Sequence, residues 1–259
     1  MENISLSRVV SDDPAVLSFC ELMKNYSVRH VDQSVKIKET KINSERVLTY
    51  IPSHRISAEG LWNLARKFNI DQSLKYTITK MYYSSKNIGV CLEKNGDKNN
   101  YRIYTETHIG KSEYERAYNN LKFKIKNVDS LKWDAENPEG VKRTSYESLL
   151  YPNPKNIQLA MHMANVKYVP KVVLDKITNL GKNTFLGTYF VTDDITSRTA
   201  VDIKFHEEFM LSDLEPELTA WSKKNLKNRL EKLDIYPIHH VSLGVDADDK
   251  NYVTVYFKL

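Results

Sequence analysis

Three segments of the chain share one pattern: an aliphatic residue and a glycine in a first strand, then strict alternation of polar and apolar residues in a second. Their glycines are Gly89, Gly187 and Gly244. Successive side chains of a strand point to opposite faces, so alternation gives each second strand an apolar and a polar face. Amphipathic helical patterns lie between these segments. Self-similar units of this kind predict a repeat architecture of β-hairpins and helices.

Helix-start signals precede each helical pattern. One helix is expected to start at Asp13, with Pro14 at the first helical position, a second near Ser57, and another at Asn153-Pro154. The pairs Ser112–Glu115 and Ser212–Glu215 match the capping box. These signals predict helices between five hairpins and therefore about ten strands.

Turn residues predict where the hairpins reverse. The expected turns are Asn43–Ser44, Asn95–Asp97, Asn137–Gly140, Asp193–Asp194 and Asp246–Asn251. Asn95-Gly96-Asp97 is the strongest turn signal of the five. The third strand pair, around 121–127 and 140–147, has the longest and most polar connection.

Composition is that of an ordinary globular chain. The 259 residues are 41% hydrophobic and 27% charged, with a formal net charge of +5. We expect a single domain over 1–259, because no low-complexity linker divides the chain. The charge allows an anionic ligand but is too small to indicate a DNA-binding protein, and we expect no nucleic-acid partner.

No sequence feature indicates a disulfide, a metal site or a membrane segment. Cys20 and Cys91 are far apart and belong to no CxxC motif, so we expect buried thiols. His239 and His240 are adjacent, and adjacent strand residues are expected to face opposite ways, so no metal-ligand set is predicted. The chain shows neither a signal-peptide pattern nor an apolar run of spanning length. We therefore expect a cytoplasmic monomer without a membrane partner.

The polar faces of the second strands carry cations and tyrosines. Alternation places Arg102, Tyr104 and Glu106 on this face of one strand, and Asp202 and Lys204 on that of another. The same rule adds Tyr252, Tyr256, Lys258 and Lys124. A solvated face of an open sheet is one interpretation. The other is the lumen of a closed barrel, since a sheet of about ten strands tends to close. Such a lumen would suit an anion with an apolar tail.

Units with cationic, tyrosine-rich faces resemble the ABBA-type aromatic prenyltransferases. The nearest local likeness is the C-terminal hairpin, His240 to Lys258. The resemblance implies an α+β fold: an antiparallel ten-stranded β-barrel of repeated αββα units with the helices outside. It also implies transfer of an allylic isoprenoid group from its diphosphate to an aromatic acceptor.

The resemblance assigns roles to particular residues. Arg102, Lys204 and Lys258 would bind diphosphate, with Lys124 or Lys142 in the third hairpin, which departs most from the family pattern. Tyr104, Tyr189 and Tyr256 would shield the allylic cation. Glu106 and Asp202 would orient or deprotonate the acceptor. The donor would be dimethylallyl, geranyl or farnesyl diphosphate, and the acceptor a small phenol or indole or an aromatic side chain of a peptide.

The sequence lacks the DDxxD motif of the all-helical prenyl-transferring enzymes. Asp193-Asp194 and Asp248-Asp249 both fail to complete it. Direct binding of diphosphate by Lys and Arg then needs no metal, but some members of the resembled family use Mg²⁺, which leaves that cofactor open.

Two other functions compete with prenyl transfer. A non-catalytic sheet-surface protein could present its tyrosines and cations to RNA or another anionic ligand. A tetrapyrrole-binding αβα enzyme would also use basic residues over a sheet. Burial of the tyrosines separates the first two: an enzyme lumen buries them, and a binding surface exposes them.

Overall fold

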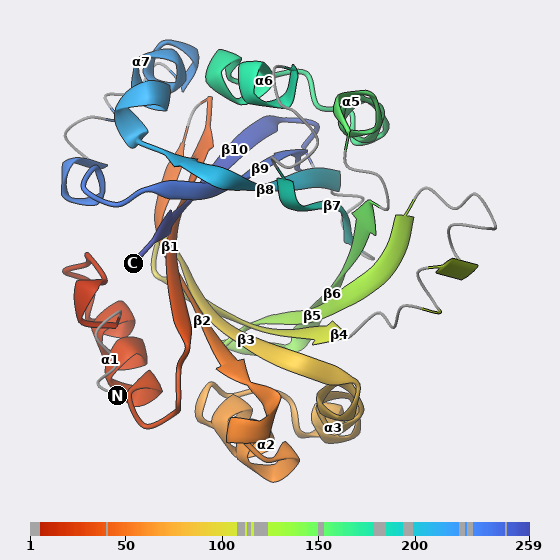
Figure 1. Ribbon diagram of the computed structural model, residues 1–259. Coiled ribbons are helices and arrows are strands. Elements are labelled where there is room, and N and C mark those ends of the chain that lie inside the picture. Colours follow the sequence, from red (N-terminus) through yellow and green to blue (C-terminus); the bar gives the residue numbers. More distant parts are fainter. Residues whose placement is uncertain are drawn as a thin grey trace.

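Ten antiparallel strands form a closed barrel, and helices cover its outside (Figure 1). The strand order around the barrel is β1-β10-β9-β8-β7-β6-β5-β4-β3-β2. Every neighbouring pair is consecutive in the chain except β1 and β10, which close the barrel. The fold predicted from the repeated hairpins is confirmed.

The computed structural model describes residues 6–39, 41–107, 112, 115–116, 124–149, 153–178, 185–193, 199–222, 226, 230–246 and 248–259. The strands are β1 (His30–Lys38), β2 (Ile42–Pro52), β3 (Ser85–Asn95), β4 (Lys98–Thr107), β5 (Lys124–Asp134), β6 (Asn137–Leu149), β7 (Phe185–Asp193), β8 (Thr199–Phe209), β9 (Ile238–Val245) and β10 (Asn251–Lys258). The helices are α1 (Pro14–Met23), α2 (Ala58–Lys67), α3 (Lys75–Tyr83), α5 (Pro154–Met163), α6 (Lys171–Thr178) and α7 (Leu211–Ser222).

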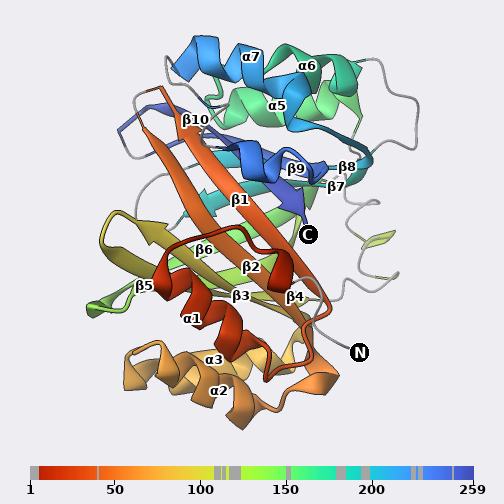
Figure 2. The same cartoon turned by 90° about the vertical axis from the view of Figure 1, so that its left-hand side faces the viewer.

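The helices form two groups on the outer wall. α1, α2 and α3 lie along β1–β4, and α5, α6 and α7 lie along β7–β10 (Figures 1 and 2). The helix starts predicted at Asp13, Ser57 and Asn153 are confirmed: each residue is an N-cap whose side chain accepts backbone N–H groups of the first turn. None of the described helices is long and apolar enough to cross a bilayer.

Alternation separates two apolar clusters, one on each face of the barrel wall. The larger lies between the strands and the helices and contains Ile103, Val201 and Val253. The smaller lies inside the barrel and contains Tyr104 and Tyr252. The face assignment made from alternation in β4, β8 and β10 is therefore confirmed. Cys20 and Cys91 are free and buried, as expected.

The recurrent glycines stand opposite large inward-facing residues. In the strand register Gly89 pairs with Tyr104, Gly187 with Lys204, and Gly244 with Tyr252. A Cβ on Gly244 would lie 2.5 Å from the Tyr252 hydroxyl oxygen, and one on Gly89 would lie 3.1 Å from the Cβ of Tyr104. Gly89 and Gly244 thus leave the space that their partner side chains occupy.

Several element boundaries differ from the sequence predictions. Asn43–Ser44 belongs to β2, so the first hairpin turns earlier, between Lys38 and Ile42. Asn137–Gly140 begins β6 and forms no long connection. The turn at 95–97 and the last hairpin are where they were predicted. Most of the turn predicted at Asp193–Asp194 lies outside the described residues.

Two helix predictions also need correction. α3 was not predicted, because in a helix of this length only Ile78 is buried and the apolar period is weak. The predicted capping box Ser212–Glu215 does not form at α7. Instead Asp213 accepts the backbone N–H of Met210, and Glu215 accepts the Thr219 hydroxyl. The segment predicted to follow Ser112–Glu115 lies mostly outside the described residues.

Candidate functional site in the barrel lumen

A cavity inside the barrel is lined by side chains from eight strands. Its lining residues are Arg46, Leu48, Tyr50, Tyr104, Glu106, Val128, Tyr146, Tyr189, Asp202, Lys204, His240 and Tyr256. The space between them is about 540 Å³, counted with its opening to solvent. Val191, Ala200 and Tyr252 pack together near the hairpin turns. We call the opposite end of the lumen, where β2 and β4 end and β1 and β9 begin, the mouth.

Arg46 is held by tyrosines and a thiol. Its Nη1 donates to the Tyr256 hydroxyl at 2.9 Å, its Nη2 to the Tyr104 hydroxyl, and its Nε to the Cys91 sulfur at 3.4 Å. Its guanidinium carbon also lies 5.3 Å from the Tyr256 ring centroid. Burial raises the pKa of Tyr104, which therefore stays a neutral hydroxyl. A hydroxyl that accepts from a guanidinium keeps its own proton to donate to an anion.

Arg102 lies behind this wall and is 4% exposed. Its Nη1 donates to the Tyr146 hydroxyl at 3.0 Å, and its guanidinium carbon lies 5.4 Å from the Tyr104 ring centroid. Its buried Nε has no hydrogen-bond partner among the described residues. Arg102 therefore adds positive charge behind the cavity, although it does not line it.

Within the described part of the chain, neither Arg46 nor Arg102 forms an ion pair with a carboxylate. The charge of the Glu93 carboxylate acts on both arginines, and this carboxylate accepts from Lys132 at 2.8 Å. Burial raises the pKa of Glu93, and Lys132 and the two arginines lower it by more, so that it stays ionised. Among the side chains that the structure describes, Arg46, Arg102 and Lys132 are the cations beside this one carboxylate, so positive charge predominates among them at the inner wall of the cavity.

Lys204 lines the cavity from β8. Its Nζ lies 5.4 Å from the Tyr189 ring centroid, and it has no hydrogen-bond acceptor among the side chains that the structure describes. Burial lowers its pKa, but Tyr189 and the carboxylates of Asp32, Glu106 and Asp202 raise it by more. The ammonium group therefore stays charged at neutral pH and is available to a ligand.

Proton-accepting groups lie in the same cavity. Glu106 accepts from the Asn87 amide at 2.9 Å. The Nε2 of His240 lies 3.6 Å from the Asp202 carboxylate, and its ring stacks on Tyr256 with the centroids 3.9 Å apart. Burial lowers the pKa of His240 to about 4. At neutral pH this imidazole is uncharged and can accept a proton.

The structure brings together most of the residues predicted for the site. Tyr104, Glu106, Tyr189, Asp202, Lys204 and Tyr256 line the cavity, and Arg102 stands directly behind it. Lys258 lies at the mouth, half-exposed, with its Nζ 2.7 Å from Glu208. Lys142 is exposed near the β5–β6 turn, opposite Lys132.

The face predicted for Lys124 is wrong. A β-bulge shifts the register between Lys126 and Val128. Residues before the bulge therefore face the side opposite to the one that alternation counted back from Val128 predicts. Lys124 therefore points to the outside of the barrel, where its Nζ pairs with Glu147 and lies 4.3 Å from the Phe190 ring centroid.

Sequence analysis missed part of the lining. Arg46, Tyr50 and Tyr146 were not assigned, although alternation through β2 would have placed Arg46 and Tyr50 on one face. The misplaced turn at Asn43–Ser44 obscured the start of that strand. Tyr146 lies in the strand whose beginning was predicted as a connection.

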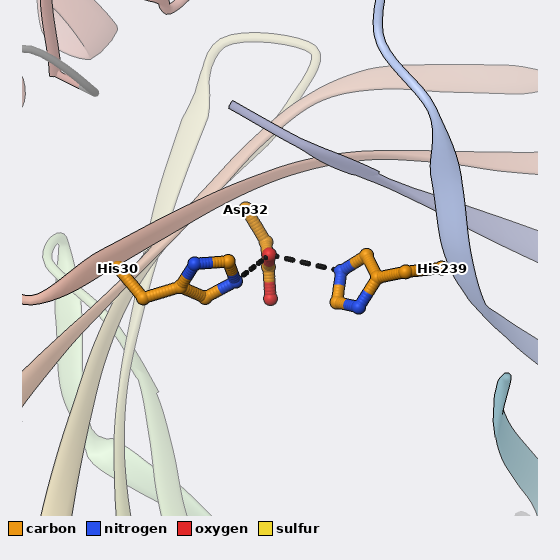
Figure 3. Close-up of side chains that lie close together, drawn as sticks. All are labelled: His30, Asp32 and His239. Carbon is orange, nitrogen blue, oxygen red and sulfur yellow. Dashed lines mark hydrogen bonds and ion pairs between the residues drawn. The ribbon is translucent and has the colours of Figure 1, made fainter. Parts of the chain in front are cut away.

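A second group of polar side chains meets at the mouth, beside the cavity. Asp32 is 3% exposed, and one of its carboxylate oxygens lies 2.5 Å from the Nε2 of His30 and 3.0 Å from the Nε2 of His239 (Figure 3). The prediction that His239 and His240 face opposite ways is wrong. A bulge between Tyr256 and Phe257 in the β9–β10 register turns His239 toward Asp32, while His240 lines the cavity.

Comparison with known proteins gives structural matches only. No family model matches the sequence, and no curated protein resembles it in sequence. The structure is similar to 5-dimethylallyltryptophan synthase from Streptomyces coelicolor, with a TM-score of 0.54 and 10% identity over 88% of this chain and 80% of that one. It is also similar to AnaPT from Neosartorya fischeri, with a TM-score of 0.52 and 10% identity over 88% and 78% of the two chains.

These matches show that the chain has the fold of the aromatic prenyltransferase barrel, as the resemblance implied. The closed barrel also removes the open sheet face that a sheet-surface RNA-binding protein would need. Tyr104, Tyr146 and Tyr256 are 8%, 9% and 5% exposed, so they are unavailable for stacking on an external base.

Proposed function

We propose that this protein transfers an allylic isoprenoid group from its diphosphate to an aromatic acceptor bound in the barrel lumen. The observation that carries the proposal is that Arg46 and Lys204 line the same tyrosine-lined cavity. Among the described side chains, Arg46 forms no ion pair with a carboxylate and Lys204 has no hydrogen-bond acceptor. Both side chains are half-buried, and a partly desolvated cation that forms no direct ion pair costs free energy. An anionic ligand would remove that cost.

The cations match the charge that develops on the leaving group. When the bond between the allylic carbon and the diphosphate oxygen breaks, negative charge grows on the diphosphate. Arg46 and Lys204 would contact that group, with the Tyr104 and Tyr256 hydroxyls as further donors. Arg102 and Lys132 would add to the potential from behind. Of the cations predicted from sequence to bind diphosphate, we therefore retain Arg102 and Lys204, and we add Arg46.

The tyrosine rings match the charge that develops on the prenyl group. An allylic cation is attracted to the faces of aromatic rings and must be kept from water. Tyr50, Tyr104, Tyr146, Tyr189 and Tyr256 surround the cavity. Leu48 and Val128 supply apolar surface for the isoprenoid chain. The donor we propose is dimethylallyl, geranyl or farnesyl diphosphate.

The acceptor forms the new bond and loses a proton. Glu106, or Asp202 with neutral His240, would take that proton from the alkylated acceptor. These groups lie in the same cavity as the cations. The acceptor class we propose is a phenol, an indole or an aromatic side chain of a peptide, because such a ring would stack on the lining tyrosines.

Incubation with allylic diphosphates tests this function. Dimethylallyl, geranyl and farnesyl diphosphate would each be supplied with a pool of phenols, indoles and aromatic peptides, with and without Mg²⁺, and products read by mass. We expect an added isoprene unit with the wild-type protein, loss of product in Lys204→Ala and Arg46→Ala, and full product in Lys124→Ala. Failure of the wild-type protein to bind any of these diphosphates by calorimetry would overturn the proposal.

A further inference from the structure

We propose that His30, Asp32 and His239 bind a divalent transition-metal ion of the zinc class at the mouth of the barrel. Among the described residues, this is the group of three whose ligand atoms lie close enough to share an ion, all within 4.8 Å of one another. His30 and Asp32 stand on one face of β1, two residues apart, and His239 reaches them from β9 (Figure 3). The three residues lie beside the cavity and do not line it, and the proposal does not depend on prenyl transfer.

The distances between ligand atoms suit a small ion. With bonds near 2.0 Å, two ligand atoms of a tetrahedral ion lie about 3.3 Å apart. Here the Asp32 oxygen lies 2.5 Å from one imidazole nitrogen and 3.0 Å from the other. Small rotations of the three side chains would therefore open the group around an ion. Both imidazoles already turn Nε2 toward the same carboxylate oxygen, so neither ring would need to flip.

The donor set determines which ions fit. Two imidazole nitrogens and one carboxylate are the ligands of zinc, iron and cobalt, whereas Mg²⁺ prefers oxygen donors throughout. Three protein ligands also leave coordination positions open for water or for an anionic oxygen. This group is therefore unsuited to the Mg²⁺ that the resemblance left open, and Mg²⁺ provides a negative control.

Burial and access favour binding at this position. Asp32 is almost fully buried, with its side chain 3% exposed, so its charge is poorly solvated and gains from a cation. His30 is 31% exposed, which gives an ion a path from solvent. The β-bulge that turns His239 toward Asp32 is a recurrent device for re-aiming a side chain next to functional sites.

Cobalt titration of the full-length protein tests the site. Co²⁺ bound by two imidazoles and a carboxylate gives visible absorption bands that are stronger than those of the hexaaqua ion. We expect saturation at one ion per chain, displacement by Zn²⁺, and a rise in the midpoint of thermal unfolding with metal concentration. We expect no displacement by millimolar Mg²⁺.

Two variants and a control separate this site from adventitious binding. His239→Ala and the nearly isosteric Asp32→Asn should each weaken Co²⁺ binding at least about tenfold, given that loss of even an outer partner of a ligand has effects of that size. His162→Ala removes an exposed histidine on α5 and should bind as wild type does. Absence of the visible bands in the wild-type protein, or equal binding by His239→Ala, would overturn the proposal. Circular dichroism of each variant checks that it is folded.

Discussion

Three cations of the lumen, Arg46, Arg102 and Lys204, have different partners from Lys124 and Lys258 elsewhere on the barrel, whereas Lys132, behind the cavity, pairs with Glu93. Arg46 and Arg102 donate to tyrosine hydroxyls, and Lys204 lies over a tyrosine ring. Outside the lumen, Lys124 pairs with Glu147, and Lys258 at the mouth pairs with Glu208. The two groups come from different strands of the same barrel and differ by the face or the end of the strand on which they lie.

The difference in partners indicates which cations are available to bind an anionic ligand. A surface lysine paired with a carboxylate already has its counter-charge, and water screens what remains. A lumen cation held by neutral hydroxyls has been oriented without being neutralised. Anion binding should therefore depend on the lumen cations and be nearly indifferent to the others.

The largest expected effect is on diphosphate affinity. Arg46→Gln should weaken the binding of inorganic diphosphate by about 10- to 100-fold, because a charged hydrogen bond is worth about 1.5–3 kcal/mol. Isothermal titration calorimetry measures this directly. Lys124→Gln, on the outer wall, should leave the dissociation constant unchanged. Equal losses in the two variants would break the distinction between lumen and wall.

The next effect concerns packing inside the barrel. Gly244→Ala places a methyl group where the Tyr252 ring lies, and we expect the free energy of unfolding to fall by about 1–3 kcal/mol, the usual cost of overpacking. Gly140→Ala is the matched control, since the nearest atom to its Cβ is 3.5 Å away. Urea unfolding of both variants gives the comparison. A Gly244→Ala protein as stable as the wild type would show that the lumen beside Tyr252 has room for a methyl group.

A smaller effect is expected from one tyrosine hydroxyl. Tyr146→Phe removes the acceptor of Arg102 Nη1, whose Nε already lacks a partner among the described residues, and should cost about 1–2 kcal/mol of unfolding free energy. Tyr189→Phe keeps the ring under Lys204 and removes a hydroxyl that has no hydrogen bond within the described structure. Its stability should match the wild type in the same chemical denaturation. Indistinguishable variants would mean that Arg102 is satisfied by water.

The smallest effect is expected at the mouth. Lys258→Met breaks the pair with Glu208, in which the two side chains are 51% and 36% exposed. An exposed pair of this kind contributes about 0.2–0.5 kcal/mol, and less in high salt. Thermal unfolding at low and high ionic strength measures it. A loss comparable to that of Tyr146→Phe would place Lys258 among the structurally important cations.

Alternation was sufficient to predict the fold and much of the lumen. Arg102, Tyr104 and Glu106 follow from the period of two in β4, and Asp202 and Lys204 from that in β8. Alternation works there because the described registers of these strands run without a bulge through these residues. The same regularity made the closed barrel predictable from the number of strands.

Two of the failures, at Lys124 and His239, share a physical cause, because a bulge leaves no reliable mark in a single sequence. The bulge near Lys126 turned Lys124 outward, and the bulge at the start of β9 turned His239 toward Asp32. Both errors reversed a face without changing the strand. Arg46 was missed for another reason: turn-forming residues at 43–44 lie within a strand, where tertiary pairing outweighs local preference.

Pairing of β1 with β10 closes the barrel and therefore determines when the lumen site forms during synthesis and folding. Tyr252 and Tyr256 come from β10, and Arg46 donates to one of them across a sequence separation of 210 residues. Contacts this distant form slowly, because a long loop must be ordered before they contribute. A nascent chain lacking β10 would have nine strands with two free edges and no enclosed lumen. Prenyl transfer as proposed therefore requires the closed barrel. A nascent chain without β10 has no enclosed lumen in which an allylic diphosphate could ionise away from water.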